Sequence, residues 1–392
     1  MTKTCPRVRQ RRICFYKNGE TIKSKVSIFP MRRIICTILA GWVLVAECES
    51  RSVVYESLGP GGDYEGTQYI TFFFTGVPVT SGMSENRNAA LSPDNTLMVY
   101  QSSVENNRYN IYAMNLITLA QGNLSNSLVN DVLPVFSPDG TKIAFFRSDG
   151  TSDYVYIMDV NGDNQRKISK TPVIAEDRIR FTGDGRNVIV TSIDNGVYNI
   201  SSVAVDGSSQ TILTAGLGGF NAQISPFSDR VVFVSGAAYF QNIYTMQSSG
   251  IGIHQVTTFS GTNFDPVFFP DEQRIVYSEY VSSGYCNIYE ISVNGDSLRR
   301  LTYSNSVDAT PVFTPDGKWI AFNRLVNNNW DICFISVDRR YEVNFTNTPF
   351  TTELFPVFCT WMQTSVMYFQ SNYTGYLHIW SSPLTELYAL RK

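Results

Sequence analysis

From residue 52 to the end, short apolar segments alternate with polar turns, and no amphipathic helical stretch of any length appears. The apolar segments are rich in β-branched and aromatic residues, as in KIAFF (142–146), RIVYS (274–278) and WIAFN (319–323). Segments of this length between turn-forming residues are typical of β-strands. The pattern therefore predicts an all-β protein.

The strands belong to an internal repeat. The clearest copies have S/T-Pro-Asp-Gly turns, at Pro138 and Pro315, and a third copy has a related turn at Pro270. The turn positions are spaced by 45, 45, 43, 44, 45 and 45 residues: Pro93, Pro138, Gly183, Pro226, Pro270, Pro315 and Thr360. A fixed period of this size with several short strands per copy predicts a β-propeller.

Each copy is interpreted as four strands. The first strand, of the type P-V-F, ends in the Pro-Asp-Gly turn, where Pro fixes φ and Gly accepts a positive φ. The second strand and a polar loop follow, and the third strand is of the type N-I-Y. An Asn-Gly or Asp-Gly turn then leads to a fourth strand such as RRLT (299–302), and these dipeptides are strong hairpin signals.

The number of blades is less clearly defined by the repeat. The first copy, residues 52–82, lacks a leading strand, although YITFFFTG and VPVT resemble a third and a fourth strand. Eight blades are favoured over the alternative of seven blades closed by N-terminal strands that join the last unit. The count of eight rests on the apolar second-strand segments around Val54, Met98, Ala144, Ile189, Val232, Val276, Ala321 and Met367.

The N-terminal region has a different composition. Residues 1–33 hold ten Lys or Arg and one acid, Glu20, and an apolar run covers 34–46. This order predicts a basic extension and a signal peptide over 1–46, with the propeller over 47–392 and a secreted or periplasmic location. A start at Met31, an uncleaved anchor and a lipid on Cys48 are the alternatives.

Composition excludes some classes of partner and of functional site. The net charge of −3 excludes a basic nucleic-acid footprint, so no nucleic-acid partner is expected. The only two histidines, His254 and His378, are expected to be half-exposed strand residues rather than metal ligands or catalytic bases. The cysteines after residue 46 match no metal-binding spacing and are expected to be buried: Cys48, Cys286, Cys333 and Cys359. A monomer without a cofactor is expected, with Ca²⁺ as the one ion considered.

Two sets of residues recur with the repeat. The turn aspartates are expected to bond backbone amides, a structural role: Asp94, Asp139, Asp184, Asp271 and Asp316. Three residues before each P-V-F position lies a second set, acidic or amide in six of seven copies: Asn86, Asp131, Glu176, Gly219, Asn263, Asp308 and Glu353. We predict that this set circles one mouth of the central channel and binds a cation such as Ca²⁺, or a basic group of a partner. The alternative is that each side chain accepts hydrogen bonds from its own strand.

The S/T-P-D-G turn followed by K-I-A-F, N-I-Y, N-G and R-x-L-T resembles the Pro-Asp propeller repeat of TolB-like proteins, which is related in shape to WD-repeat propellers. The resemblance covers 52–392 and implies a propeller fold. We do not expect TolB itself, because the residues before the first clear repeat show no βαβ pattern like that of the α/β domain of TolB. Similar repeats occur in prolyl oligopeptidases, but the G-x-S-x-G nucleophile motif of their hydrolase domain does not occur here.

The resemblance and the lack of catalytic motifs favour a non-enzymatic, exported scaffold that binds a protein or peptide partner at one propeller face, with membrane contact only through the signal segment. One alternative is a hydrolase or lyase acting on a saccharide or peptide through carboxylates such as Asp131, Glu176, Asp308 and Glu353. Another is a peptidase-type propeller without its catalytic domain.

Overall fold

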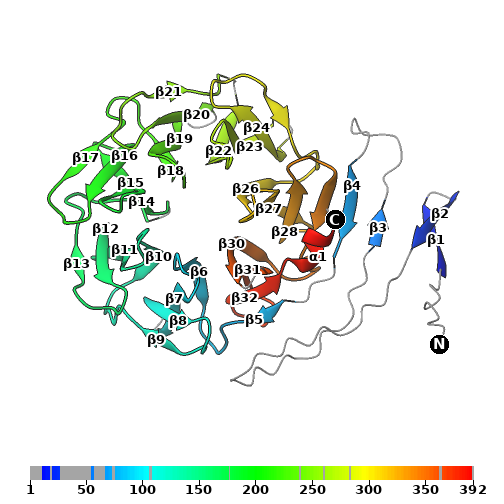
Figure 1. Ribbon diagram of the computed structural model, residues 1–392, viewed down its shortest axis with the longest axis horizontal. Helices are drawn as coiled ribbons and strands as arrows, with labels where there is room; N and C mark the ends of the chain where they lie inside the picture. Colours follow the sequence, from blue (N-terminus) through cyan, green and yellow to red (C-terminus); the bar gives the residue numbers. More distant parts are fainter. Residues whose placement is uncertain are drawn as a thin grey trace, which may run out of the picture.

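The computed structural model shows a ring of β-sheets around a central axis (Figure 1). It describes residues 11–17, 20–26, 54–56, 67–72, 76–105, 108–175, 177–237, 240–258, 261–281, 284–361 and 364–390. The all-β propeller prediction is confirmed. The signal segment predicted at 34–46 lies outside the described residues.

Seven antiparallel units of four strands make up the ring in this described part of the chain. They are blade 1, β6 (Asn86–Leu91), β7 (Leu97–Glu105), β8 (Arg108–Asn115) and β9 (Gln121–Asn123); blade 2, β10 (Asp131–Phe136), β11 (Lys142–Ser148), β12 (Asp153–Asp159) and β13 (Arg166–Lys167); blade 3, β14 (Arg180–Phe181), β15 (Asn187–Asp194), β16 (Val197–Ala204) and β17 (Gln210–Ile212); blade 4, β18 (Phe220–Ile224), β19 (Arg230–Ala237), β20 (Phe240–Gln247) and β21 (His254–Gln255); blade 5, β22 (Thr262–Phe268), β23 (Arg274–Tyr280), β24 (Cys286–Ser292) and β25 (Arg299–Arg300); blade 6, β26 (Asp308–Phe313), β27 (Trp319–Val326), β28 (Asn329–Ser336) and β29 (Tyr341–Asn344); and blade 7, β30 (Glu353–Trp361), β31 (Thr364–Ser371), β32 (His378–Pro383) and β5 (Val77–Pro78).

Blade 7 is closed by a strand from the other end of the chain. The strand β5 pairs with β32, with Val77 opposite Ser381. Just beyond β5, the Thr80 hydroxyl accepts a hydrogen bond of 2.9 Å from the backbone N–H of Ile379. A Ser or Thr makes the same contact in each of the other blades: Ser125, Ser169, Thr214, Thr257, Thr302 and Thr346. The VPVT segment is therefore the fourth strand of the last blade, which joins the two ends of the propeller.

The remaining strands before residue 72 lie outside the ring. The strand β4 (Gln68–Thr71) pairs in parallel with β29 of blade 6, and β3 (Val54–Glu56) pairs with β4. A separate hairpin is formed by β1 (Arg11–Lys17) and β2 (Glu20–Val26). The favoured count of eight is thus not what the described residues show. The first copy, 52–82, extends blade 6 and completes blade 7 instead of forming a blade of its own.

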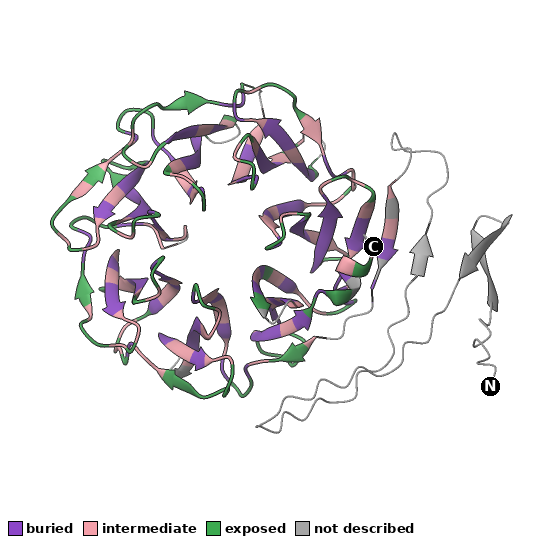
Figure 2. Cartoon of the chain, viewed as in Figure 1, coloured by how far each residue is buried: buried purple, intermediate pink, exposed green. Residues whose placement is uncertain are grey.

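The hydrophobic core is divided among the contacts between neighbouring blades. Figure 2 shows the buried residues concentrated in the sheets around the ring. Between blades 2 and 3, for example, Phe146 and Val155 pack with Ile179 and Val190. A cluster of this kind also joins blade 7 to blade 1, where Ile379 packs with Met98 and Tyr100. Because every blade covers its neighbour, the ring buries the sheet faces that single blades would expose to water.

The turn aspartates have the structural role predicted for them. Asp139 accepts from the Ser137 hydroxyl at 2.6 Å and from the backbone N–H of Thr141 at 3.0 Å. These hydrogen bonds hold the pKa of Asp139 below its usual value, the Ser137 hydroxyl being the largest cause. The same backbone N–H contact, two residues after the aspartate, recurs at Asp94, Asp184, Asp271 and Asp316.

Strand order defines two faces of the ring. Hairpins between second and third strands, and the links between blades, lie on one face, which we call the loop face. The Pro-Asp-Gly and Asn-Gly turns lie on the opposite, turn face.

Cys286, Cys333 and Cys359 are free and buried, as expected for small apolar residues. The one helix in the described residues, α1 (Thr385–Ala389), follows the last strand. A search of the same residues found no helix long and apolar enough to cross a membrane.

Candidate functional site

The residues predicted to circle the channel mouth are buried in their own blades. Asp131 is 0% exposed and accepts from Nε and Nη2 of Arg147, at 2.7 and 2.8 Å. Asp308 is equally buried and accepts from the corresponding atoms of Arg324, at 2.7 and 2.9 Å. Glu353 accepts from the Ser371 hydroxyl at 2.8 Å. These donors lie on the second strand of the same blade, whereas the alternative interpretation expected donors from the residue's own strand.

The amide members of the set are also buried, but they contact the preceding blade of the ring. The Nδ2 atom of Asn86 lies 3.1 Å from Nδ1 of His378, and that of Asn263 donates to the Gln241 carbonyl at 2.8 Å. Glu176 lies outside the described residues. Among the residues that the structure describes, no group of three or more His, Cys, Asp or Glu could hold a metal ion. Binding of Ca²⁺ or of a basic group by this set stays a prediction.

A bulge in the inner strands explains why these residues turn away from the channel. In six inner strands the pairing register shifts after the first, second or third residue. A β-bulge inserts one residue and re-aims the side chains next to it. The inserted residue has a left-handed backbone and lies two positions after the predicted set: Asn88, Leu133, Asn221, Asp265, Thr310 and Phe355.

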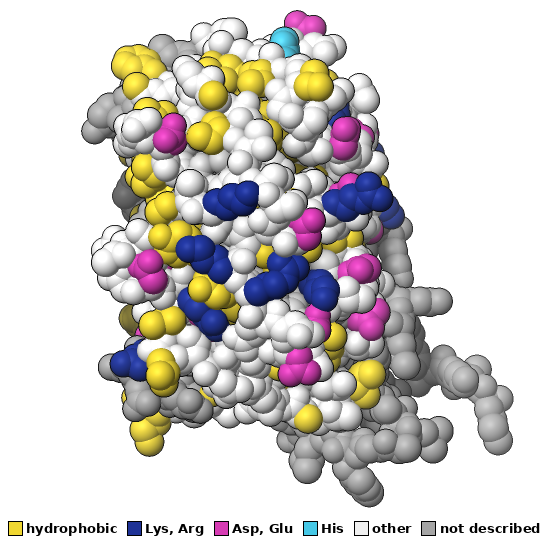
Figure 3. Space-filling model, turned by 90° about the vertical axis from the view of Figure 1, so that its left-hand side faces the viewer, with side chains coloured by type: hydrophobic (Ala, Val, Ile, Leu, Met, Phe, Trp, Pro, Cys, Tyr) yellow, Lys and Arg dark blue, Asp and Glu magenta, His cyan; other side chains and the backbone are white. Residues whose placement is uncertain are grey.

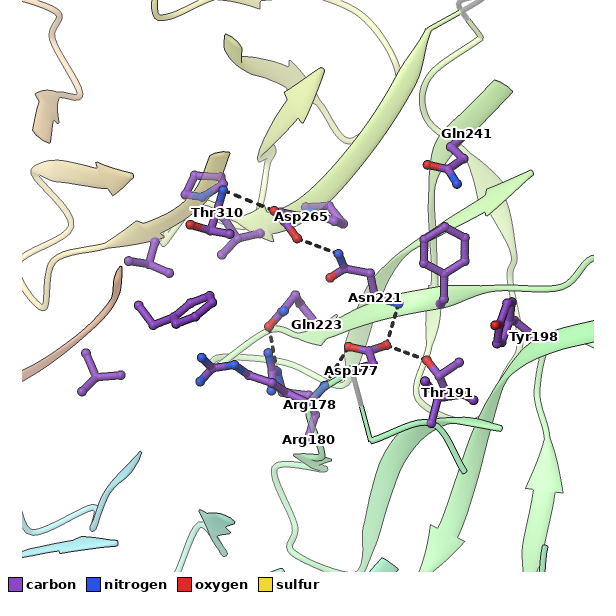
Figure 4. Close-up of a pocket in the computed structure, with 18 of the residues that line it drawn as sticks. Asp177, Arg178, Arg180, Thr191, Tyr198, Asn221, Gln223, Gln241, Asp265 and Thr310 are labelled. Carbon is purple, nitrogen blue, oxygen red and sulfur yellow. Dashed lines mark hydrogen bonds between the residues drawn. The ribbon is translucent and has the colours of Figure 1, made fainter. Parts of the chain in front are cut away.

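Four of these bulge residues line a cavity of about 690 Å³ at the loop-face end of the central channel: Asn221, Asp265, Thr310 and Phe355. Blade 3 contributes the most charged part of its wall, Asp177, Arg178 and Arg180 (Figure 4). Arg178 occupies the position in the 45-residue series that a bulge residue has in the other blades. Blade 3 differs from them because its inner strand, β14, starts only at Arg180.

Asp177 is held by donors of two blades. Its Oδ2 accepts from the Thr191 hydroxyl at 2.5 Å and from the backbone N–H of Asn221 at 2.6 Å. Its Oδ1 accepts from the backbone N–H of Arg178 at 2.8 Å. Both oxygens are thus engaged by neutral groups that the fold positions.

Asp265 continues this chain of contacts across the next blades. Its Oδ1 accepts from Nδ2 of Asn221 at 2.7 Å, and its Oδ2 from the backbone N–H of Thr310 at 3.2 Å (Figure 4). Burial raises the pKa of the Asp265 carboxyl, while these hydrogen bonds lower it. Blades 3 to 6 are therefore linked around the channel by side chains at the bulge level.

The two arginines make few contacts with the protein. Arg180 donates from Nε to the Gln223 side chain at 2.7 Å and from Nη1 to the Ile179 carbonyl at 3.1 Å. The Arg178 guanidinium lies 5.5 Å from the centre of the Phe355 ring. No carboxylate of the described residues forms an ion pair with Arg178 or Arg180. Burial, followed by the charge of Arg178, lowers the pKa of Arg180 to about 10.

The opposite wall is apolar. It is built from three consecutive inner strands and consists of Pro266, Val267, Pro311, Val312, Phe355, Pro356 and Val357. The proline in each P-V motif comes directly after the bulge residue. The cavity thus combines a cationic side with a wall that offers almost no competing hydrogen-bond partners.

The cavity residues follow the same 45-residue series as the predicted set, at a different position in the strand. Arg178, Asn221 and Asp265 follow the 45-residue series as closely as the predicted set does, two residues later along the chain. The expectation for His378 was wrong, because this side chain is buried, at 2% exposure. The loops after the second strands were predicted to be polar, yet an exposed aromatic side chain, Tyr373, lies in one of them.

The family model for the TolB beta propeller domain matches residues 69–238 and 219–376. The chain belongs to this family. Among solved structures, an oligogalacturonate lyase from Vibrio parahaemolyticus is similar over 86% of this chain and 98% of its own, with 12% identity and a TM-score of 0.60. The propeller domain of the Trilobed protease from Pyrococcus furiosus covers 78% and 97%, with 14% identity and a TM-score of 0.57. TolB from Acinetobacter baumannii covers 66% of this chain and 62% of its own, with 17% identity and a TM-score of 0.48. At these identities the likeness establishes the TolB-type propeller fold alone.

Proposed function

We propose that this TolB-type propeller is a scaffold that binds a protein or peptide partner on its loop face. The observation that carries the proposal is the distribution of exposed apolar side chains. Twelve large ones lie on loop-face hairpins and links: Met83, Leu128, Ile193, Val197, Tyr198, Leu217, Phe240, Tyr280, Tyr285, Phe350, Tyr373 and Tyr376. Six lie on the turn face: Ile117, Leu119, Phe227, Ile251, Ile253 and Leu298.

The chemistry of the loop-face side chains also fits a protein partner. Aromatic residues and methionine are enriched in the cores of protein interfaces, and tyrosine is enriched among the residues that dominate binding energy. Phe350 is 87% exposed and Met83 is 88% exposed, so binding would remove much apolar surface from water. Because the loops project from rigid blades, little ordering of the backbone opposes association.

The proposal includes export of the chain, which rests on the composition of residues 1–46. It describes a monomer that acts without a cofactor and without nucleic acid. Oligogalacturonate lyase is among the proteins with the same fold, but three of the four carboxylates that the enzyme alternative invoked, Asp131, Asp308 and Glu353, are engaged inside the blades. The fourth, Glu176, lies outside the described residues. The binding alternative is therefore the one that we pursue.

The test is an affinity capture from the exported proteins of the source cell, with three forms of the chain. The loop-face variant is Phe240→Ser with Phe350→Ser, and the control is Phe227→Ser with Ile251→Ser on the turn face. These four side chains are all well exposed, at 61, 87, 68 and 66%, so neither variant is expected to unfold. A partner retained by the native chain and the control, but lost from the loop-face variant, is the expected result. Equal retention by all three forms, or no partner at all, would overturn the proposal.

A further inference from the structure

The cavity in the channel is lined by two arginines whose guanidinium groups form few hydrogen bonds with the protein. Arg178 and Arg180 follow each other on one side of blade 3, and Figure 4 shows both side chains extending into the space between the blades. A guanidinium carries five N–H donors. Arg180 uses two of its groups, Nε and Nη1, and the Arg178 guanidinium donates to no group of the described residues.

The nearby carboxylates, Asp177 and Asp265, attract Arg178 electrostatically but are held in place by other donors and form no ion pair with it. Both oxygens of Asp177 accept from the Thr191 hydroxyl or backbone N–H groups. Both oxygens of Asp265 are engaged with Asn221 and Thr310. The backbone donors are fixed by the strands, so a rotation of either acid toward an arginine would leave a buried N–H without an acceptor.

The outer wall of the propeller provides a contrast. Figure 3 shows Lys and Arg side chains gathered over the outer strands of blades 2 and 3, with Asp and Glu between them. On the turn face, Lys142 pairs with Asp159. The side chain of Arg186 is 84% exposed. These cations are solvated or paired. In the channel, burial lowers the pKa of both Arg178 and Arg180, which means that their charged forms have lost hydration.

We propose that Arg178 and Arg180 form a carboxylate-binding site, which takes an acidic side chain of the peptide partner. Guanidinium groups bind carboxylates through paired, charge-assisted hydrogen bonds. The apolar wall of Pro311, Val312 and Phe355 strengthens such a pair, because it keeps high-dielectric water away from one side. The wall also fits the aliphatic stem of a Glu and an apolar neighbour in the peptide.

The mouth of the cavity connects this site to the loop face. Tyr198 lines the cavity and is also 51% exposed among the apolar loop-face residues. A peptide lying on that face would therefore reach the arginines with a side chain directed into the channel. This inference rests on the proposed function, because it assigns the charged contact of a partner that binds the same face.

The test starts with a selection of displayed 12-residue peptides on the full chain. We expect the recovered peptides to share a Glu or Asp with an apolar residue beside it. Dissociation constants are then measured for one recovered peptide and its Glu→Gln or Asp→Asn form. The proteins are the native chain, the Arg178→Gln/Arg180→Gln variant, and an Arg186→Gln/Arg340→Gln control. Arg186 and Arg340 have side chains 84% and 76% exposed, so the control loses the same charge outside the channel.

Neutralising the peptide acid should weaken binding to the native chain and to the control about 10- to 100-fold. The channel variant should bind both peptides with similar, weak affinity, and thermal melting should confirm that it is folded. Equal affinity of the native chain and the channel variant for the acidic peptide would overturn the carboxylate site but leave the proposed function intact. Recovery of no peptide would contradict both. Binding of tri-galacturonate that depends on the two arginines, in the absence of peptide binding, would assign the site to an acidic saccharide and overturn the peptide proposal.

Discussion

Two pairs of arginines in this propeller lie in opposite environments. Arg147 and Arg324 lie inside blades 2 and 6, where each forms two hydrogen bonds with a fully buried aspartate. Arg178 and Arg180 lie on the channel wall of blade 3 and have no ion-pair partner among the described residues. The first pair connects strands of the fold. The second pair leaves its hydrogen-bonding capacity directed into a cavity, so the same side chain serves stability in one place and is available to a ligand in the other.

The largest effect should come from Asp131→Ala. Arg147 would lose its one carboxylate partner among the described residues and keep Gln165 and the nearby ring of Tyr156. An uncompensated buried charge costs about 3–5 kcal/mol, which urea unfolding would measure. The double variant Asp131→Ala/Arg147→Met should recover much of that loss. A single variant as stable as the native chain would show that the pair is not structural.

Asp308→Ala should lower the free energy of unfolding by less than Asp131→Ala does, by about 1–3 kcal/mol. Arg324 also donates from Nη1 to Glu342, so one carboxylate remains after Asp308 is removed. Comparing the two alanine variants in one unfolding experiment shows how much Glu342, the second acid, contributes to the free energy of unfolding. A greater loss for Asp308→Ala than for Asp131→Ala would contradict this reading of the two blades.

His378 tests what happens to a buried base that, unlike arginine, can lose its charge. Its Nδ1 lies 3.1 Å from Nδ2 of Asn86, and burial lowers its pKa below the ordinary value of 6.5. The unfolded chain therefore binds more protons below about pH 6.5, so stability is present above that pH and falls as the pH drops toward the folded pKa. Melting temperatures should show this decline in the native chain and in His254→Gln, and a smaller one in His378→Gln. An unchanged pH profile for His378→Gln would refute the prediction.

The smallest effect on folding is expected from Arg178→Met. Arg178 is partly exposed and has no ion-pair partner among the described residues, so an apolar side chain of similar length should change the free energy of unfolding by less than about 1 kcal/mol, or stabilise the chain. Urea unfolding beside Asp131→Ala gives the comparison directly. A loss as large as that of Asp131→Ala would mean that Arg178 has a structural role like that of Arg147, and the contrast between the two pairs would not hold.

The repeat explains how much could be predicted from the sequence. Each copy folds through local contacts, such as the hydroxyl of Ser137 and the backbone of Thr141 on Asp139, so its turns and strands follow from neighbouring residues. The closure could also have been found, because Thr80 of VPVT matches Thr302 of RRLT. The second-strand segments left seven and eight blades open, with eight favoured, because such a segment does not show which sheet its neighbours join.

The candidate site was missed for a different reason. A two-residue alternation places Asp131 and Leu133 on the same side of a regular strand, but the bulge between Val132 and Val135 breaks that alternation. The gathering of Asp177, Asn221 and Asp265 also depends on contacts between residues 44 positions apart.

The sequence by itself determined the all-β repeat, its period and its turns, because these depend on residues close together in the chain. Only the tertiary structure decided that 77–80 completes the last blade and that two arginines face the channel. It also decided that the bulges turn one set of acids away from the channel and into the blades. Those features depend on ring closure, which brings distant copies together and fixes which side of each inner strand faces the axis.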